Sequence, residues 1–309
     1  MNIDLKLGYD CNNNCIHCVI ADKREIANKR IGTTNRTTEQ CKAELFESRI
    51  AGCYTVILTG GEPTIRKDLL EIVECANGLG YIISMQTNGR MFFYPEFCEL
   101  LSPYNIVYVI ALHGPTAEIH DSITRASGSF EQTVQGIKNL KALHQNVIGK
   151  LVIQKNNIPC LEKTVDLFLE LGIKTINMAF PHPLGNAKEN FQFVVPRYSE
   201  TRTTLLTLID KVKKVNIGRD DENRIKIIFE TLPFCVIEEA DEYNHEKICQ
   251  KTETYIKDLV SSTQKWNVER PKEKTKFPQC EQCAQKNDCE GVWKEYSEEY
   301  GGQEFQPLK

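Results

Sequence analysis

Three cysteines stand close together near the start of the chain, in the segment Cys11-Asn-Asn-Asn-Cys15-Ile-His-Cys18. They follow an apolar–polar alternation over residues 3–7 that predicts a short strand. A loop after a strand can wrap three thiolates around one metal centre, and thiolates select zinc or an iron–sulfur cluster. A structural zinc site normally takes four protein ligands, whereas three thiolates on a four-iron cluster leave one iron open. Three cysteines that only pack are disfavoured, because free cysteines rarely cluster in this way.

A second motif, Thr59-Gly60-Gly61-Glu62-Pro63-Thr64, follows the next predicted strand, residues 54–58. Two glycines permit positive φ and the close backbone approach that hydrogen bonding to a small zwitterion requires. The Glu62 carboxylate can accept a charge-assisted hydrogen bond from an ammonium group. Taken alone, the motif is equally consistent with a glycine turn that binds no ligand.

Together, and in this order after consecutive strands, the two motifs resemble those of the radical S-adenosylmethionine (AdoMet) superfamily, over roughly residues 1–195. The resemblance implies that Cys11, Cys15 and Cys18 bind a 4Fe–4S cluster whose open iron chelates AdoMet. It implies reductive cleavage of AdoMet to methionine and a 5′-deoxyadenosyl radical, which takes hydrogen from an unactivated C–H bond. It also implies that the Gly60-Gly61-Glu62 turn binds the AdoMet amino group.

The same resemblance implies further contacts to AdoMet. His17 stands where the family usually has an aromatic residue against the adenine; the alternative is a solvent-facing loop histidine. Arg125, after the fourth predicted strand, is expected to pair with the AdoMet carboxylate through its guanidinium fork, or else to form a surface salt bridge. The remaining contacts, to ribose and adenine, are expected where the fifth and sixth strands end, at Gln154, Asn156 and Asn186.

The elements that position these motifs alternate between strand-like and helix-like stretches. The predicted strands are rich in Ile, Val and Tyr and mostly lack alternation, as expected for strands covered on both faces. They span residues 2–8, 54–58, 81–86, 106–112, 147–154 and 175–180, with helices at 38–52, 68–78, 130–144 and 161–171. Repeated βα units without hairpin signals indicate parallel strands with right-handed crossovers, in a doubly wound sheet or a barrel. The resemblance favours an α/β fold of the barrel type, a partial (β/α)6 TIM-like barrel.

The pattern changes after about residue 197. Residues 198–215 predict a long amphipathic helix and residues 225–229 a further strand, whereas the highly charged stretch 238–276 predicts a surface helix and a loop. We therefore expect two domains: a radical AdoMet barrel over residues 1–215 and a small cysteine-rich domain over residues 216–309.

The cysteines of the tail are spaced Cys280-x2-Cys283-x5-Cys289. This spacing resembles the start of the SPASM signature, in which another cysteine follows. Here Val292-Trp293 stands in its place, so the tail resembles the shortened, twitch-like form with one auxiliary 4Fe–4S cluster. A zinc ribbon is the competing interpretation.

The resemblance implies that the auxiliary cluster is held entirely by protein and serves in electron transfer or structure. The expected ligands are Cys235, Cys280, Cys283 and Cys289. Cys249 either replaces Cys235 as a ligand or is a free thiol that donates hydrogen to a substrate radical, which makes it the candidate catalytic residue.

The composition of the 309-residue chain is that of a globular protein, with 41% hydrophobic and 26% charged residues. A net charge of −4 and a pI near 6.0 argue against a nucleic-acid-binding face built on bulk charge. No apolar run is long enough to span a bilayer, and no signal-peptide core is evident. Thirteen cysteines then indicate metal ligation in a reducing compartment rather than a disulfide framework. We expect a cytoplasmic protein without nucleic-acid or membrane partners.

Enzymes with such a core and a cysteine-rich tail mostly modify ribosomally made peptides. The leading expected substrate is therefore a peptide or protein, modified by hydrogen abstraction with a flavodoxin- or ferredoxin-type reductant. Because few residues precede the first strand, a peptide substrate would need a separate recognition protein or a short leader contact. The alternatives are dehydrogenation or rearrangement of a small metabolite, sugar or nucleoside, and a non-catalytic iron–sulfur carrier. The Gly60-Gly61-Glu62 turn counts against the carrier, which has no need to bind an amino acid.

Overall fold

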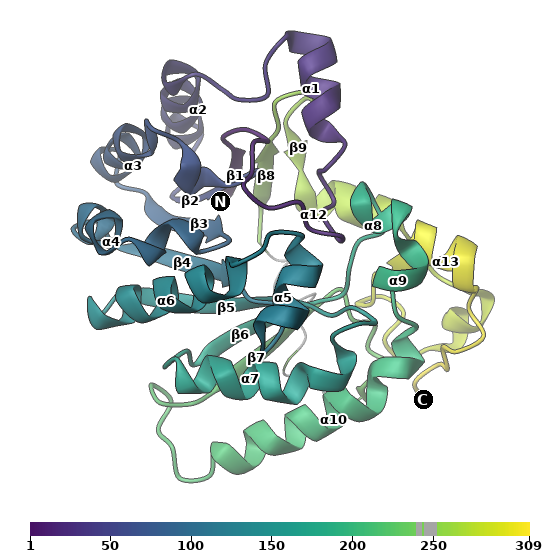
Figure 1. The fold of residues 1–309 in the computed structure, drawn as a ribbon. Coiled ribbons are helices and arrows are strands. Elements are labelled where there is room, and N and C mark those ends of the chain that lie inside the picture. The colour runs from purple at the N-terminus through teal and green to yellow at the C-terminus, as the bar shows by residue number, and fades with distance from the viewer. Residues whose placement is uncertain (239–242, 244–251) are drawn as a thin grey trace.

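The computed structural model describes residues 1–238, 243 and 252–309, so Cys249 lies outside the described residues. Its main sheet has the strand order β7-β6-β5-β4-β3-β2-β1-β8-β9 (Figure 1). Neighbouring strands from β7 to β8 pair in parallel, and β9 pairs with β8 antiparallel. The strands are β1 Asn2–Lys6, β2 Thr55–Thr59, β3 Ile82–Thr87, β4 Ile106–Ala111, β5 Asn146–Val152, β6 Thr175–Ala179, β7 Lys226–Glu230, β8 Thr254–Lys257 and β9 Gln264–Lys265.

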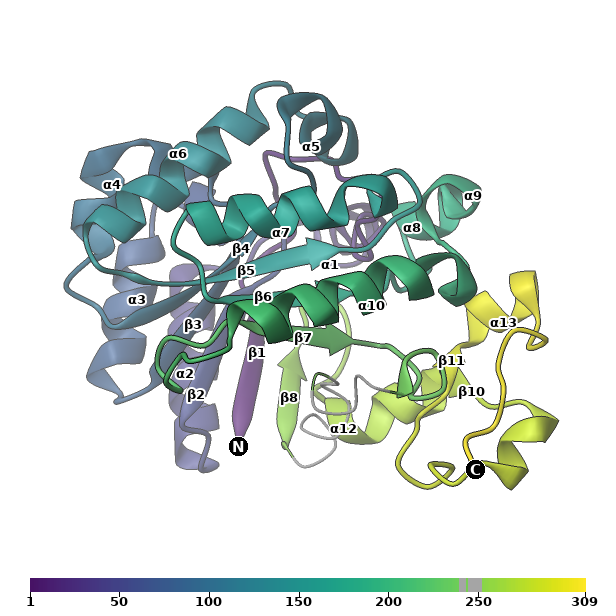
Figure 2. The ribbon, with the colours of Figure 1, turned by 90° about the horizontal axis from the view of Figure 1, so that it is seen from below.

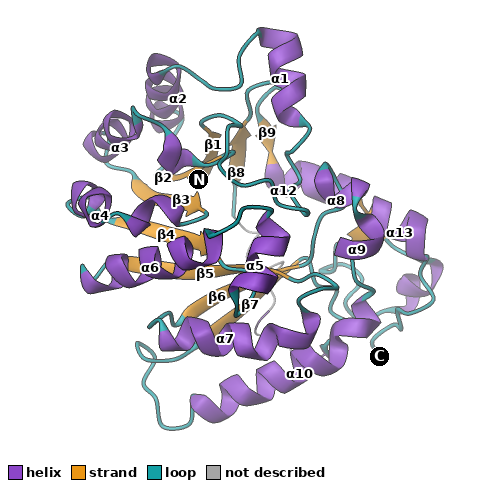
Figure 3. Ribbon diagram, viewed as in Figure 1, coloured by secondary structure: helices purple, strands orange, loops and turns teal. Residues whose placement is uncertain are grey.

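Helices cover the outer face of this curved sheet (Figure 3). They form where apolar residues recur at helical spacing, and their buried side chains share one core with the strands. A capping box between Thr37 and Gln40 begins α2. The helices are α1 Lys23–Ile31, α2 Thr38–Ile50, α3 Leu69–Gly78, α4 Pro95–Leu101, α5 Ala117–Thr124, α6 Ser129–Ala142, α7 Leu161–Glu170, α8 Asn186–Glu189, α9 Phe191–Val194, α10 Tyr198–Val215, α12 Trp266–Glu269 and α13 Lys294–Tyr300.

The inner face of the sheet is only partly covered. In β4, Ile106, Tyr108 and Ile110 are fully buried towards the helices, whereas the alternate residues Val107 and Val109 keep some exposure. Strands β1, β5, β6 and β7 show the same alternation. The expectation of strands covered on both faces is therefore wrong for the inner face, because an incomplete barrel leaves that face open to solvent.

The predicted strands and the predicted helices of the barrel all form, with ends within two residues of those expected. The helices α1, α4, α5, α8 and α9 were not predicted. The charged stretch after residue 238 also differs from expectation, because residues 254–257 form β8 beside β1 in the main sheet. The sheet thus continues past residue 215, and the predicted division into domains at that residue stays a prediction.

The C-terminal segment lies beside the carboxyl ends of β6 and β7, close to α9 (Figure 2). Its two-stranded antiparallel sheet pairs β10 (Lys274–Thr275) with β11 (Val292–Trp293). The Trp293 ring stacks on His182 of the loop after β6, with centroids 3.6 Å apart and planes 6° apart. The short tail sheet is thereby packed against the mouth of the barrel. No helix within the described ranges is long and apolar enough to cross a membrane.

Candidate metal centre and active site

The cysteine loop, residues 9–18, follows β1 and interlocks with the turn that follows β2. The Gly61 N–H donates to the carbonyl oxygen of Gly8, and the Glu62 N–H donates to that of Asp10, both at 2.8 Å. A Cβ atom at Gly61 would lie 2.1 Å from the Asp10 carbonyl oxygen. Glycine is therefore required here by the close approach of two backbones, in addition to any role in binding a ligand.

The Glu62 side chain joins the ends of β2 and β3. It is 3% exposed, and its Oε1 accepts hydrogen bonds from the Thr64 backbone and hydroxyl and from the Thr87 hydroxyl. Its Oε2 accepts one bond, from the Asn88 N–H at 2.7 Å. Burial raises the pKa of Glu62 above its ordinary value, while these hydrogen bonds act in the opposite direction. Oε2 keeps acceptor capacity for the predicted ammonium contact.

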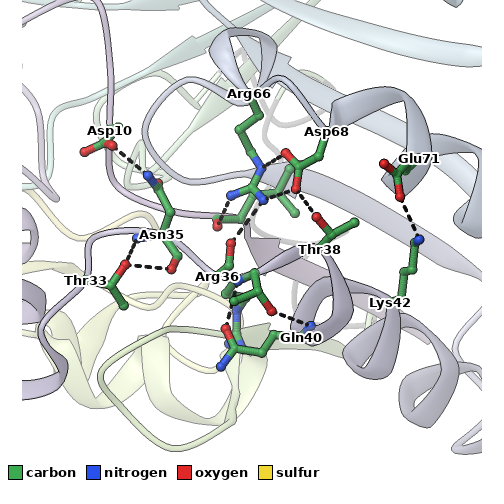
Figure 4. Close-up of polar contacts among 12 residues, drawn as sticks. Asp10, Thr33, Asn35, Arg36, Thr38, Gln40, Lys42, Arg66, Asp68 and Glu71 are labelled. Carbon is green, nitrogen blue, oxygen red and sulfur yellow. Dashed lines mark hydrogen bonds and ion pairs between the residues drawn. The ribbon is translucent and has the colours of Figure 1, made fainter.

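Polar side chains from the segments before α2 and α3 hold the same loop (Figure 4). Asp10 accepts a hydrogen bond from Asn35 Nδ2 at 2.6 Å. Arg66 donates to the carbonyl oxygen of Leu7 at 3.0 Å, and its guanidinium is held by both carboxylate oxygens of Asp68. This bidentate pair gives the arginine a fixed orientation, so the start of the cysteine loop is fixed as well.

Two further side chains hold the cysteine loop from other strands. Arg90, after β3, donates from Nη1 to the Asn13 side chain at 2.7 Å. Asn186, after β6, donates from its backbone to the Cys18 carbonyl at 2.9 Å and from Nδ2 to the Cys15 carbonyl at 2.8 Å. The sequence interpretation assigned Asn186 to adenine, and the structure places it against the loop. Arg90 was not predicted; its only signal is a Thr-Asn-Gly turn directly after a strand.

Three imidazole rings pack together behind the loop. The rings of His17 and His113 meet edge to face at 4.6 Å, and those of His113 and His120 stack at 5.8 Å. Gln154 is fully buried, with Nε2 3.0 Å from Nδ1 of His17. Burial lowers the pKa of His17 and of His120 to about 4 and holds that of His113 well below its ordinary value. The rings are thus neutral at pH 7, and two predicted AdoMet contacts, His17 and Gln154, lie together.

Two other predicted AdoMet contacts lie at the rim. Arg125 is exposed and donates from Nη2 to Asn190 Oδ1 at 3.0 Å. Asn156 is also exposed. Its neighbour Asn157 is buried and accepts from the Gln154 N–H at 2.7 Å. The structure therefore places Asn157, which sequence reasoning missed, in the support of the site, while the roles of Arg125 and Asn156 stay predictions.

The three loop thiols fit a cluster by their chemistry. Burial raises the pKa of Cys11 to about 11, raises that of Cys15 further, and raises that of Cys18. The Cys11 and Cys18 thiols add to the rise at Cys15, which shows that the three are neighbours. A positively charged iron core would supply the charge that stabilises such thiolates. Across the described part of the chain, no three His, Cys, Asp or Glu side chains are arranged to hold a single metal ion.

The tail cysteines also come together. A hollow of about 370 Å³, partly open to solvent, is lined by Cys235, Cys280, Cys283 and Cys289. Burial raises the pKa of Cys235 to about 12, and the other three thiols add to this rise. The residues predicted to hold an auxiliary cluster thus face one hollow, and the donor set fits a four-iron cluster. The alternative ligand, Cys249, lies outside the described residues.

A partial parallel barrel with a three-cysteine loop after its first strand, interlocked with a Gly-Gly-Glu turn after its second, defines a class of iron–sulfur enzymes that bind AdoMet. Residues 5–168, just over half of the chain, match the family model described as the Radical SAM superfamily. The chain belongs to the radical SAM superfamily. This membership gives its cofactors as a 4Fe–4S cluster and AdoMet.

Several curated proteins are related in sequence. The AdoMet-dependent heme synthase of Methanosarcina barkeri is 30% identical over 60% of this chain and 52% of its own length. The mycofactocin maturase MftC of Mycobacterium tuberculosis is 29% identical over 69% of this chain and 53% of its own length. The chain thus spans about half the length of the curated relatives it matches.

Solved structures show the same fold across the whole chain. Streptococcus suis SuiB bound to S-adenosylmethionine superposes with a TM-score of 0.71 and 14% identity, over 99% of this chain and 76% of SuiB. Native anSMEcpe with bound AdoMet and Cp18Cys peptide gives 0.70 and 15%, over 99% of this chain and 92% of that one. These likenesses extend beyond the family match into the tail, which confirms the predicted fold class.

Proposed function

We propose that this protein reductively cleaves AdoMet and uses the resulting 5′-deoxyadenosyl radical to take hydrogen from a peptide or protein. The observation that carries the proposal is the interlock between the cysteine loop and the Gly60-Gly61-Glu62 turn in a member of the radical SAM superfamily. The interlock sets three thiols beside a turn whose polar groups suit an amino-acid head group.

In this proposal Cys11, Cys15 and Cys18 hold the AdoMet-binding cluster, which when bound supplies an electron to the sulfonium. The Gly60-Gly61-Glu62 turn holds the AdoMet amino group. His17 and Gln154 line the adenine and ribose side. The other predicted contacts contribute from two places, Arg125 and Asn156 from the rim and Asn186 from beside the cysteine loop. The neutral state of His17 suits this role, because a cationic imidazolium would repel the nearby sulfonium.

The tail cysteines hold a second, fully protein-ligated 4Fe–4S cluster in this proposal. The common hollow of Cys235, Cys280, Cys283 and Cys289 supports it. We assign this cluster to electron transfer or structure, because four protein ligands leave no open iron for a substrate. Cys249 is retained as a candidate hydrogen donor. The division into a barrel, residues 1–215, and a tail domain, residues 216–309, belongs to the same proposal.

A peptide substrate is favoured by the relation to a mycofactocin maturase and by a fold like that of SuiB, which has been crystallised with its precursor peptide SuiA. A flavodoxin- or ferredoxin-type protein would deliver the electron. The thirteen cysteines suit a reducing, cytoplasmic setting. A small-metabolite substrate is the second candidate, favoured by the relation to an AdoMet-dependent heme synthase.

The test is an anaerobic assay of the iron-reconstituted protein with AdoMet and dithionite. Formation of 5′-deoxyadenosine is expected, and none forms if the protein is a simple iron–sulfur carrier. Candidate peptides, including any short reading frame encoded beside this gene, are then supplied with deuterium at their C–H bonds. Transfer of deuterium into 5′-deoxyadenosine from a peptide supports the leading substrate class; transfer only from small metabolites contradicts it.

A further inference from the structure

Three polar side chains lie side by side on the inner wall of the barrel. Lys150 of β5 and Asn177 of β6 are direct register partners, and Glu230 ends β7 on the next strand. All three occupy positions that alternate with residues buried against the helices, so their side chains point to the inner face. We call Lys150, Asn177 and Glu230 the wall triad.

Two members of the wall triad, Lys150 and Asn177, have hydrogen-bonding capacity that the described residues leave unused. The Lys150 ammonium forms an ion pair with Glu230, with the two side chains only 23% and 25% exposed. An ammonium carries three N–H donors, and this pair uses one. Asn177 Oδ1 is buried, and no described residue donates a hydrogen bond to it. A buried carbonyl oxygen without a donor is unfavourable, so a bound group that donates to it would remove this penalty.

The wall triad is also linked to both cysteine sites. The Lys150 ammonium is close enough to His113 to lower the pKa of that imidazole, and His113 packs on His17 of the cysteine loop. Glu230 is followed within five residues by Cys235 of the tail hollow, a span of at most roughly 17 Å. A group held at the triad would therefore lie near the AdoMet side and near the tail side at once.

The backbone beside the triad is strained. Thr231, directly after Glu230, has φ of +60°, a conformation that a β-branched residue rarely adopts. Its carbonyl oxygen accepts a hydrogen bond from the Tyr198 hydroxyl at 2.9 Å, which holds the bend in place. Such strain persists where the surrounding structure enforces it, commonly at ligand sites. The bend at Thr231 therefore fixes the position of Glu230 at the end of β7, on the inner face of the sheet.

We propose that Lys150 and Asn177, oriented by Glu230, bind an amide group of the substrate, and this rests on the proposed peptide substrate. The amide oxygen accepts from the Lys150 ammonium and the amide N–H donates to Asn177 Oδ1. A free carboxylate is disfavoured because it would meet the Glu230 carboxylate, and a free ammonium because it would meet Lys150. A neutral amide satisfies both groups. It comes either from the peptide backbone or from an Asn or Gln side chain.

The test begins with a display selection of random 12-residue peptides on the reconstituted holoenzyme loaded with AdoMet. Affinities of the enriched peptides are then measured for the wild type, for Lys150→Met and for Asn177→Leu. We expect each substitution to weaken binding by about tenfold or more, because each removes a hydrogen bond in a partly buried site. Lys211→Met is the matched control: Lys211 pairs with Asp166 on the outer helices at similar exposure, and its loss should leave affinity unchanged.

Chemical variants of the tightest-binding peptide distinguish a backbone amide from an Asn or Gln side-chain amide. Each backbone amide is replaced in turn by an ester, and each Asn or Gln by Met. One replacement should weaken peptide binding to the wild type by about tenfold. The same replacement should have little further effect on binding to Asn177→Leu, because that variant already lacks the Oδ1 atom to which the amide donates. The position of that replacement identifies the source. If no replacement is coupled to Asn177, the inference is wrong.

Failure of this inference differs from failure of the proposed function. Peptides that bind Lys150→Met and Asn177→Leu as tightly as the wild type overturn the wall triad alone. A selection that enriches no peptide on the wild type overturns the peptide substrate, and the inference with it. Iron content and melting temperature are measured for both variants. Asn177→Leu leaves the Lys150–Glu230 pair intact, so it serves if Lys150→Met does not fold.

Discussion

The two cysteine sites of this molecule are supported in different ways. The N-terminal loop is held at both ends of its cysteine run by hydrogen bonds from strand ends and their loops, for example from Arg90 and Asn186. The tail hollow is built from short segments, with two-residue strands β10 and β11 and a single turn that carries Cys280. A long sheet provides the first site with a scaffold that the second site lacks.

The interior next to the tail hollow is also polar. Glu290, directly after Cys289, is buried and pairs with Arg270 and Lys274, which are buried too. Buried ion pairs add little net stability. Among the described residues after 252, the buried apolar side chains are Val292, Trp293, Tyr296 and Phe305, and they pack on the core of the barrel. The comparison therefore indicates that the barrel folds without its cluster, whereas the tail depends on metal for a large part of its stability.

The largest expected effect is on activity, from loss of a loop thiol. Cys15→Ala should lower 5′-deoxyadenosine formation by roughly 100-fold or more, because two thiolates no longer hold the cluster on which cleavage depends. Its melting temperature should stay within a few degrees of the wild type, because the loop is held by the backbone bonds of its neighbours. Iron content, product yield and thermal unfolding are measured together.

Cys75→Ala serves as the control for this substitution, since Cys75 is a half-buried thiol on α3, away from both sites. It should retain iron and activity. A Cys15→Ala protein that keeps full iron and turnover would show that the loop is not the cluster site. One that unfolds would show that the barrel is not independent of its metal.

The second prediction concerns the tail. Cys283→Ala should lose the auxiliary iron and expose the tail to protease, with cleavage after Lys274, where β10 begins, faster by roughly tenfold while barrel peptides stay protected. Limited proteolysis read by mass spectrometry locates the cuts. Equal protection of tail and barrel after iron loss would mean that the tail folds on its packing alone, for instance through the Trp293 stack on His182.

Most of the fold could be predicted because its signals are local and repeated. Each barrel strand is a short apolar run followed by a helix with apolar spacing, and the βα order fixes parallel pairing. Strand β8 could not be found in this way. Its four residues, Thr254–Lys257, are polar at both ends, and its place beside β1 is set by tertiary pairing that no local pattern reports.

The candidate site was predictable where residue type alone limits the chemistry. Clustered thiols and the paired glycines were informative for this reason. Residues that act through geometry were not, since Arg90 and Asn157 look like ordinary turn residues until the strands bring them to the loop. Asn186 was predicted to contact the adenine of AdoMet, and in the structure its side chain donates a hydrogen bond to the Cys15 carbonyl oxygen.

The third prediction tests that geometric support. Arg90→Met removes hydrogen bonds from one guanidinium to Asn13 and Gln132. The expected loss is about 1–2 kcal/mol of unfolding free energy, at the low end for charged hydrogen bonds because the side chain is partly exposed. Cluster reconstitution should also slow. Denaturant unfolding measures the first effect and iron uptake the second. Arg219→Met, on an exposed turn, should change neither.

The smallest expected effect is a change in pH dependence within the imidazole group. Burial lowers the pKa of His120 to about 4 from its ordinary 6.5. Between these values the unfolded chain binds a proton that the folded chain does not, so stability falls as the pH drops from 6.5 towards 4 and levels off below. His120→Asn keeps an acceptor near the Nδ1 position for the His113 N–H but does not titrate. As the pH drops through this window, the unfolding free energy of His120→Asn should fall less steeply than that of the wild type. The difference between the two slopes should be at most about 1.4 kcal/mol per pH unit.

Anaerobic urea unfolding at several pH values between 7 and 4 measures this slope. The matched control is His144→Asn, because His144 is exposed and has a φ of +56°, which asparagine also adopts. Its slope should equal that of the wild type. An unchanged slope in His120→Asn would mean that His120 takes up its proton over the same pH range in the folded protein as in the unfolded chain. The stack with His113 would then carry a charge beside the cysteine loop, and the comparison would change, because the N-terminal site would also contain a buried ion.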